Sequence, residues 1–178
     1  MLDVVLVSDP KPAASAAQFD SFEAAFEAGY VPLVRALTVM CGDRETAADC
    51  VQEAFVKAYT RWRKISKYDQ PLAWVRRVAI NTMHDHTRKR VRGNRAIARL
   101  GADDPVFNPD PVAYELGAVL SGLPQQQRVA ATLFYVEDLS VAEIAETMGL
   151  SSGAVKYHLH AARDRLRLSL APFAEDCG

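Results

Sequence analysis

The sequence predicts an all-α protein of two small helical domains joined by a flexible linker, the C-terminal domain being a helix-turn-helix. Apolar residues recur at steps of three and four almost throughout, and alternating strand patterns are scarce. The stretch from Gly93 to Pro111 holds two glycines and three prolines, which is typical of a linker. The predicted division is a loose leader over 1–18, a first domain over 19–93, the linker over 94–111, a second domain over 112–171 and a tail over 172–178.

The first domain is expected to begin with a helix near Asp20 or Ser21, because either side chain can cap one. Gly29 and Pro32 are expected to interrupt this helix, since both residues disfavour a helix interior. The second piece then ends at Gly42.

A long helix is predicted from Arg44, capped by Asp43, to about Ile65. A turn over 68–71 follows, and Pro71 suits the first position of the next helix, which ends in a basic run. The apolar stripe of the long helix comprises Ala47, Val51, Ala54, Phe55, Ala58, Trp62 and Ile65.

The second domain contains the most specific pattern. A helix over 125–136 precedes a short helix that Ser140 can cap, and a turn at Gly149 leads to a helix from Ser152 to about Leu168. Two short helices joined by a turn of this length are typical of the DNA-binding helix-turn-helix, whose second helix enters the major groove.

One face of that second helix is polar and nearly free of acids. A solvated face on an ordinary helical hairpin is the alternative interpretation, but small residues at the helix start and basic side chains after it favour DNA contact. The candidate DNA-binding residues are Ser152, Gly153, Lys156, Tyr157, His160 and Arg163.

The formal net charge of −1 conceals a strong alternation along the chain. Residues 57–99 carry a net +11 and residues 156–167 a net +3, whereas residues 1–56 and 100–155 are acidic. Such an asymmetry indicates a polyanionic partner for the basic segments.

The larger basic segment includes a helix in which aromatic and polar side chains interleave with arginines. A basic run alone is usually a solvated face, but this mixture suits contact with a nucleic-acid backbone and its unstacked bases. The preceding helix exposes a polar edge at Asp49, Gln52 and Glu53 that could dock another protein.

The sequence indicates no enzyme, metal site or cofactor. Cys41 and Cys50 lie on apolar helices without a histidine nearby in sequence, and no glycine-rich phosphate loop is present. The two His-x-His pairs, His84/His86 and His158/His160, point in different directions on a helix. Without a signal peptide or a run of about 18 apolar residues, we expect a cytoplasmic protein with no membrane insertion.

Four segments resemble the extracytoplasmic-function (ECF) type of bacterial RNA polymerase sigma factor, of the sigma-70 superfamily. Residues 49–59 are similar to the family's acidic "D-x-V-Q-E-x-F-x-x-A" helix, and residues 71–81 to its "P-x-x-W-L-x-x-I-A-x-N" segment. Residues 123–129 and 139–156 resemble its second conserved domain. The order of these segments carries the resemblance.

The resemblance implies a sigma factor that binds core RNA polymerase and promoter DNA and performs no chemistry. The helix with Asp49, Gln52 and Glu53 would dock on the clamp helices of the beta-prime subunit, while the second domain rests on the beta flap and reads the −35 element. A separate anti-sigma factor is the family's usual regulator. The residues implied at the −10 element are Trp74, Arg76, Arg77, Asn81, Thr82, His84, Arg88 and Arg90.

A helix-turn-helix transcriptional regulator that acts without core polymerase is the main alternative. It explains residues 125–168 equally well, but it leaves the segments 49–59 and 71–92 unexplained.

Overall fold

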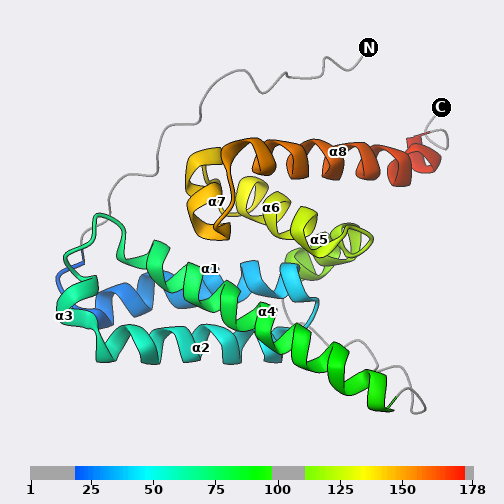
Figure 1. Ribbon diagram of the computed structural model, residues 1–178. Helices are drawn as coiled ribbons and strands as arrows, with labels where there is room; N and C mark the ends of the chain where they lie inside the picture. Colours follow the sequence, from blue (N-terminus) through cyan, green and yellow to red (C-terminus); the bar gives the residue numbers. More distant parts are fainter. Residues whose placement is uncertain (1–18, 98–110, 175–178) are drawn as a thin grey trace.

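A computed structural model of the protein describes residues 19–97 and 111–174 (Figure 1). All regular secondary structure in these residues is α-helical, as predicted. The predicted leader and most of the linker lie outside the described residues, as do the last four residues of the predicted tail. The helices are α1 (Phe22–Cys41), α2 (Arg44–Thr60), α3 (Trp62–Ile65), α4 (Pro71–Ile97), α5 (Pro111–Ser121), α6 (Gln125–Tyr135), α7 (Val141–Met148) and α8 (Ser152–Ala174).

Helix α1 is continuous, and the predicted interruption at Gly29 and Pro32 is wrong. The Ser21 side chain caps the helix by accepting a hydrogen bond from the backbone N–H of Ala24, at 3.1 Å. The helix packs closely at Gly29, because a Cβ there would lie 2.5 Å from a methyl carbon of Leu72, and that side chain would have to shift. Burial on both sides of the proline therefore outweighs the one helix hydrogen bond that it removes.

The helix that begins at Arg44 is shorter than predicted. Asp43 caps it as expected, accepting from the backbone N–H groups of Glu45 and Thr46. At Arg61 the backbone leaves helical geometry, with φ −119° and ψ 13°, and the single turn α3 follows. The predicted apolar stripe continues across this break, since its members are buried apart from the partly buried Trp62.

Helix α4 begins at Pro71, as predicted, and extends to Ile97. It therefore continues four residues into the range expected to be linker. The interval between α4 and α5, residues 98–110, lies outside the described residues.

The helix-turn-helix has the local chemistry that the sequence predicts. Ser140 and Glu143 form a reciprocal capping box at the start of α7. Gly149 ends α7 with φ +66°, in the left-handed region that glycine adopts without strain. Ser151 then accepts from the backbone N–H of Ala154, at 3.2 Å, and so caps α8.

The helices form two layers, which we call the N-terminal unit (α1–α4) and the C-terminal unit (α5–α8) (Figure 1). The units share a core, because α1 packs against α5 and α6 while α4 packs against α7. One buried cluster contains Leu33 and Leu37 of α1 together with Leu133 of α6 and Ile144 of α7. A second cluster places Val39 of α1 among buried side chains of the C-terminal unit.

Helix α1 is also the one described helix long and apolar enough to cross a membrane, judged by length and composition alone. Half of its apolar window is buried inside the protein. The position of α1 between the two units therefore accounts for its apolar composition.

Replacing Gly149 with alanine should destabilise the fold through backbone strain alone. Nothing lies within 4 Å of a Cβ at this position, so the cost comes from the positive φ. We expect Gly149→Ala to lower the free energy of unfolding by about 1 kcal/mol in urea denaturation. Gly122→Ala is the matched control, because its Cβ also meets nothing and its φ is not positive; it should change stability by less than about 0.5 kcal/mol. Equal losses of stability in the two variants would contradict the assignment of the cost to the positive φ of Gly149.

Candidate nucleic-acid interface

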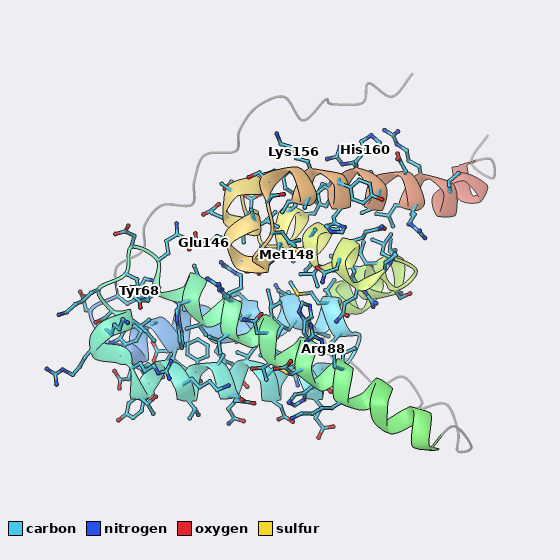
Figure 2. All side chains as sticks on the ribbon, in the orientation of Figure 1. Tyr68, Arg88, Glu146, Met148, Lys156 and His160 are labelled. Carbon is cyan, nitrogen blue, oxygen red and sulfur yellow. The ribbon has the colours of Figure 1, made fainter. Side chains whose placement is uncertain are left out.

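Helix α8 is anchored by one face and presents the other to solvent. Val155, Leu159 and Ala162 are buried against α6 and α7, at the spacing that the sequence predicts. Lys156 and His160 point away from the N-terminal unit in Figure 2. The second helix of the helix-turn-helix is thus open along the side expected to meet DNA.

Five of the six predicted residues on this face are exposed: Ser152, Gly153, Lys156, Tyr157 and His160. Tyr157 is 68% exposed, so its ring is accessible from solvent. His160 Nδ1 lies 2.9 Å from a carboxylate oxygen of Asp164, so the acid orients the imidazole. Small residues at the start of α8 leave its N-terminal backbone accessible to a phosphate.

Arg163 differs from the other five residues because it is only partly exposed. Its Nε atom is buried and has no hydrogen-bond partner among the described residues. The guanidinium is therefore less accessible than the other polar groups of this face.

Helix α4 presents a second polar stripe. Its members are spaced by three, four and seven residues and therefore lie on one side of the helix: Trp74, Arg77, Asn81 and Arg88. Arg77, Asn81 and Arg88 are exposed, while Trp74 is partly buried. An amide between arginines, next to an indole ring, suits contact with unpaired bases and their backbone.

Three other predicted residues of α4 are less accessible or lack a described side chain, although His84, seven residues after Arg77 and four before Arg88, has the spacing of the stripe. Thr82 is 8% exposed, so its prediction as a DNA contact does not fit this arrangement. His84 is partly buried, and its burial, followed by the charge of Arg88, lowers its pKa, so the imidazole is neutral at pH 7. Arg90 lies in α4, but its side chain is outside the described residues.

Arg76 points to the C-terminal unit instead of to the stripe. Its Nη2 and Nε atoms each lie 3.2 Å from Oε2 of Glu137, which follows α6. The two side chains are 15% and 10% exposed. Burial raises the pKa of Glu137, and the neighbouring guanidinium partly offsets this rise.

A cleft of about 510 Å³ lies beside this ion pair, between the start of α4 and α7. Its N-terminal wall carries Lys67, Arg76 and Arg77, and its C-terminal wall carries Glu143 and Glu146. Gln70 Nε2 reaches Oε1 of Glu143 across the boundary, at 3.4 Å. Figure 2 shows Glu146 and Tyr68 on opposite sides of this boundary.

The polar edge of α2 lies apart from both basic surfaces. Asp49, Gln52 and Glu53 are exposed, as predicted, and Val56 and Tyr59 extend the same surface with apolar area. Glu53 accepts a hydrogen bond from Lys57 at 2.6 Å, and this bond lowers the pKa of Glu53. This edge of α2 therefore combines charged, amide and apolar side chains on one exposed surface.

The contacts between the units were not predicted from the sequence. Arg76 and Glu137 are 61 positions apart, and Gln70 and Glu143 are 73 positions apart. Local periodicity holds no information on such pairs. The opposite net charges of the two segments were the only signal that could have suggested them.

The described cysteines are poorly suited to nucleophilic chemistry. Burial is the main cause of a raised pKa at Cys41 and raises that of Cys50 to about 12. Within residues 19–97 and 111–174 no group of three or more potential ligands is placed to hold a metal ion.

Comparison with known families identifies both units. The family described as Sigma-70 region 2 matches residues 26–93, and the family described as Sigma-70, region 4 matches residues 114–166. The first match covers most of α1–α4, and the second covers the helix-turn-helix and most of α8.

Several curated proteins are similar over most of the chain. An RNA polymerase sigma-E factor of Streptomyces avermitilis is 33% identical over 141 residues, covering 78% of each chain. The ECF RNA polymerase sigma factor SigW of Bacillus subtilis is 29% identical over 147 residues, covering 74% of this chain and 79% of that protein. The factor SigE of Mycolicibacterium smegmatis is 28% identical, and the chain spans only 56% of its length.

Two solved structures have the same fold. The sigma factor RpoE of Bartonella quintana, in complex with the anti-sigma factor NepR, superposes with a TM-score of 0.74 at 21% identity, covering 84% of this chain and 96% of that chain. CnrH, in complex with the cytosolic domain of CnrY, gives a TM-score of 0.61 at 22% identity, covering 85% and 88%.

The raised pKa values predict that the two described thiols are unreactive in the folded protein. In a Cys177→Ser chain at pH 8.5, we expect the Cys50 thiol to react with iodoacetamide roughly a thousandfold more slowly than in urea, because its thiolate fraction falls about tenfold per pKa unit. Mass spectrometry of time points measures both rates. Equal alkylation in native buffer and in urea would contradict the burial of Cys50.

Proposed function

Since this chain belongs to the sigma-70 family of RNA polymerase sigma factors, as a member of the ECF type, we propose that it binds core RNA polymerase and selects promoters through two separate DNA surfaces. The −10 element is recognised and melted by α4, and the −35 element is read as duplex by α8. The protein performs no chemistry itself and acts in the cytoplasm.

The observation that carries this proposal is the separation of three exposed surfaces on one chain. The polar face of α8, the stripe on α4 and the edge of α2 each belong to a different helix, and each is accessible over most of its residues. A regulator that acts without polymerase needs only the first of these surfaces.

The α8 face supports duplex reading. Lys156, Tyr157 and His160 are exposed and long enough to reach base edges in the major groove. The accessible helix start at Ser152 and Gly153 suits a backbone phosphate, which would fix the register of the helix.

The α4 stripe supports capture of a melted strand. Arg77 and Arg88 provide charge for the backbone, and Asn81 lies between them with a donor and an acceptor for the edge of an extruded base. Trp74 offers a partly exposed ring at the end of the stripe.

The α2 edge supports docking on the clamp helices of the beta-prime subunit, through Asp49, Gln52 and Glu53. Val56 and Tyr59 add the apolar area that a specific interface requires. The C-terminal unit would rest on the beta flap. A separate anti-sigma protein would regulate the chain by covering one or more of these surfaces.

The decisive experiment is run-off transcription with core polymerase on candidate promoters. We expect the chain to form a stoichiometric complex with core and to support promoter-dependent initiation. If core polymerase does not retain the chain in a pull-down, while the chain still binds duplex DNA, the result would indicate a helix-turn-helix regulator instead. Loss of both core binding and initiation would refute the proposal.

Substitutions should separate the two DNA surfaces. We expect Lys156→Ala and His160→Ala to weaken binding to a −35 duplex, Lys156→Ala by about tenfold, because each removes a groove contact. Asn81→Ala should leave that binding unchanged and slow open-complex formation by roughly tenfold. Fluorescence anisotropy and permanganate footprinting measure the two effects.

Arg165→Ala is the matched control for Lys156→Ala. Arg165 is also exposed on α8, but nine residues later it lies on the opposite side of the helix. Equal losses for the two alanine variants would indicate a general charge effect. A loss of duplex binding in Asn81→Ala would contradict the proposed division between α4 and α8.

A further inference from the structure

The solvent-facing side of α8 is divided lengthwise into two strips of different chemistry. One strip is cationic, because Lys156, His160 and Arg167 are exposed and are spaced by four and seven residues, which places them on one side of the helix. Lys156 and His160 point away from the N-terminal unit (Figure 2). Cations at this spacing suit the phosphates along one strand of a duplex.

The other strip is apolar and consists of Ala154, Tyr157 and Ala161. These residues are spaced by three and four positions, so they share one side of α8. Because successive residues of an α-helix are about 100° apart, Tyr157 lies about 100° around the helix from Lys156. Tyr157 is exposed and the two alanines are partly exposed, so a ligand can reach this apolar strip from solvent.

The ring of Tyr157 is restrained by its neighbour. Its centroid lies 5.6 Å from that of the His158 ring, and the two ring planes are inclined by 65°. His158 is itself partly buried. This contact limits the rotamers of Tyr157 before any ligand is bound, which reduces the entropy lost when DNA covers the ring.

Amide side chains, which identify adenine, are missing from the sequence of α8. Between Ser152 and Ala174 there is no Asn and no Gln, and these two residues form the paired hydrogen bonds that recognise adenine in the major groove. The thymine of the same base pair carries a methyl group in this groove, and alanine and phenyl rings contact it. Helix α8 is therefore better equipped to identify an A·T pair by its thymine methyl than by its adenine.

We propose that Tyr157, with Ala154 and Ala161 beside it, reads thymine methyl groups in the −35 duplex. The inference rests on the proposed function of α8 and adds the class of base that this chain selects. From Ala154 to Ala161 the apolar strip covers about 10 Å of helix, which is the rise of about three base pairs. One to three neighbouring thymines are therefore within its reach.

The first experiment locates the methyl groups that matter, using the chain in complex with core polymerase. Promoters randomised over the −35 segment are selected for binding and sequenced. Each enriched thymidine is then replaced singly by deoxyuridine, which lacks only the C5 methyl group. In competition binding we expect at least one replacement to weaken the complex about fourfold, which is the effect of exposing one buried methyl group.

The second experiment assigns that methyl contact to Tyr157. Tyr157→Ala should remove the preference for thymidine over deoxyuridine at one position, because the ring that covers the methyl group is lost. Tyr157→Phe should keep the preference, since it retains the ring and lacks only the hydroxyl group.

Leu168→Ala is the matched control, because it also shortens an exposed apolar side chain on this side of α8. Leu168 is 77% exposed, and it lies eleven residues after Tyr157, about 16 Å further along the helix and beyond the apolar strip. This variant should discriminate thymidine from deoxyuridine as wild type does.

The proposal is overturned if no enriched position depends on the methyl group, or if Tyr157→Ala weakens binding to both duplexes equally. Equal losses in Tyr157→Phe and Tyr157→Ala would also overturn it, and would assign the tyrosine hydroxyl to a phosphate instead. These results leave the proposed function intact, since the complex would still select promoters. If the complex with core polymerase selects no promoter at all, the proposed function is wrong and this inference fails with it.

Discussion

Helix α1 has to bury apolar side chains on two sides, and the arrangement of the protein depends on this constraint. Leu37 and Met40 lie in a buried cluster that joins α2 and α4 to α6 and α7, while Val39 lies in a second cluster whose other members belong to the C-terminal unit. Neither unit alone covers all of these residues. Removing apolar area from water therefore favours the packed state of the two units, whatever the charged side chains at their boundary contribute.

Charge is distributed unevenly over this packed structure. The acidic residues of α2 form one outer surface, and the basic residues of α8 form another. Between them, cations of α4 meet carboxylates of the C-terminal unit at Arg76 and Glu137. A buried ion pair of this kind contributes little net stability compared with apolar residues, but breaking it by removing one partner is costly.

Local chemistry could be predicted from the sequence, and distant contacts could not. Ser140, Gly149 and the buried positions of α8 follow from capping, positive φ and helical spacing, which act over a few residues. The continuity of α1 through Pro32 was missed because it depends on packing against Leu72 and Phe55. The ion pair at Arg76 and the burial of Thr82 depend on how two distant segments pack, which one sequence does not reveal.

The pairing of Arg76 also bears on how the free chain distributes itself in the cell. Non-specific affinity for DNA rises steeply with the number of cations available to displace counterions, and a chromosome offers roughly a million competing sites or more. An arginine already neutralised by Glu137 contributes nothing to that affinity. The folded chain thereby keeps part of its charge from random DNA, which leaves a larger fraction of it in solution for polymerase to collect.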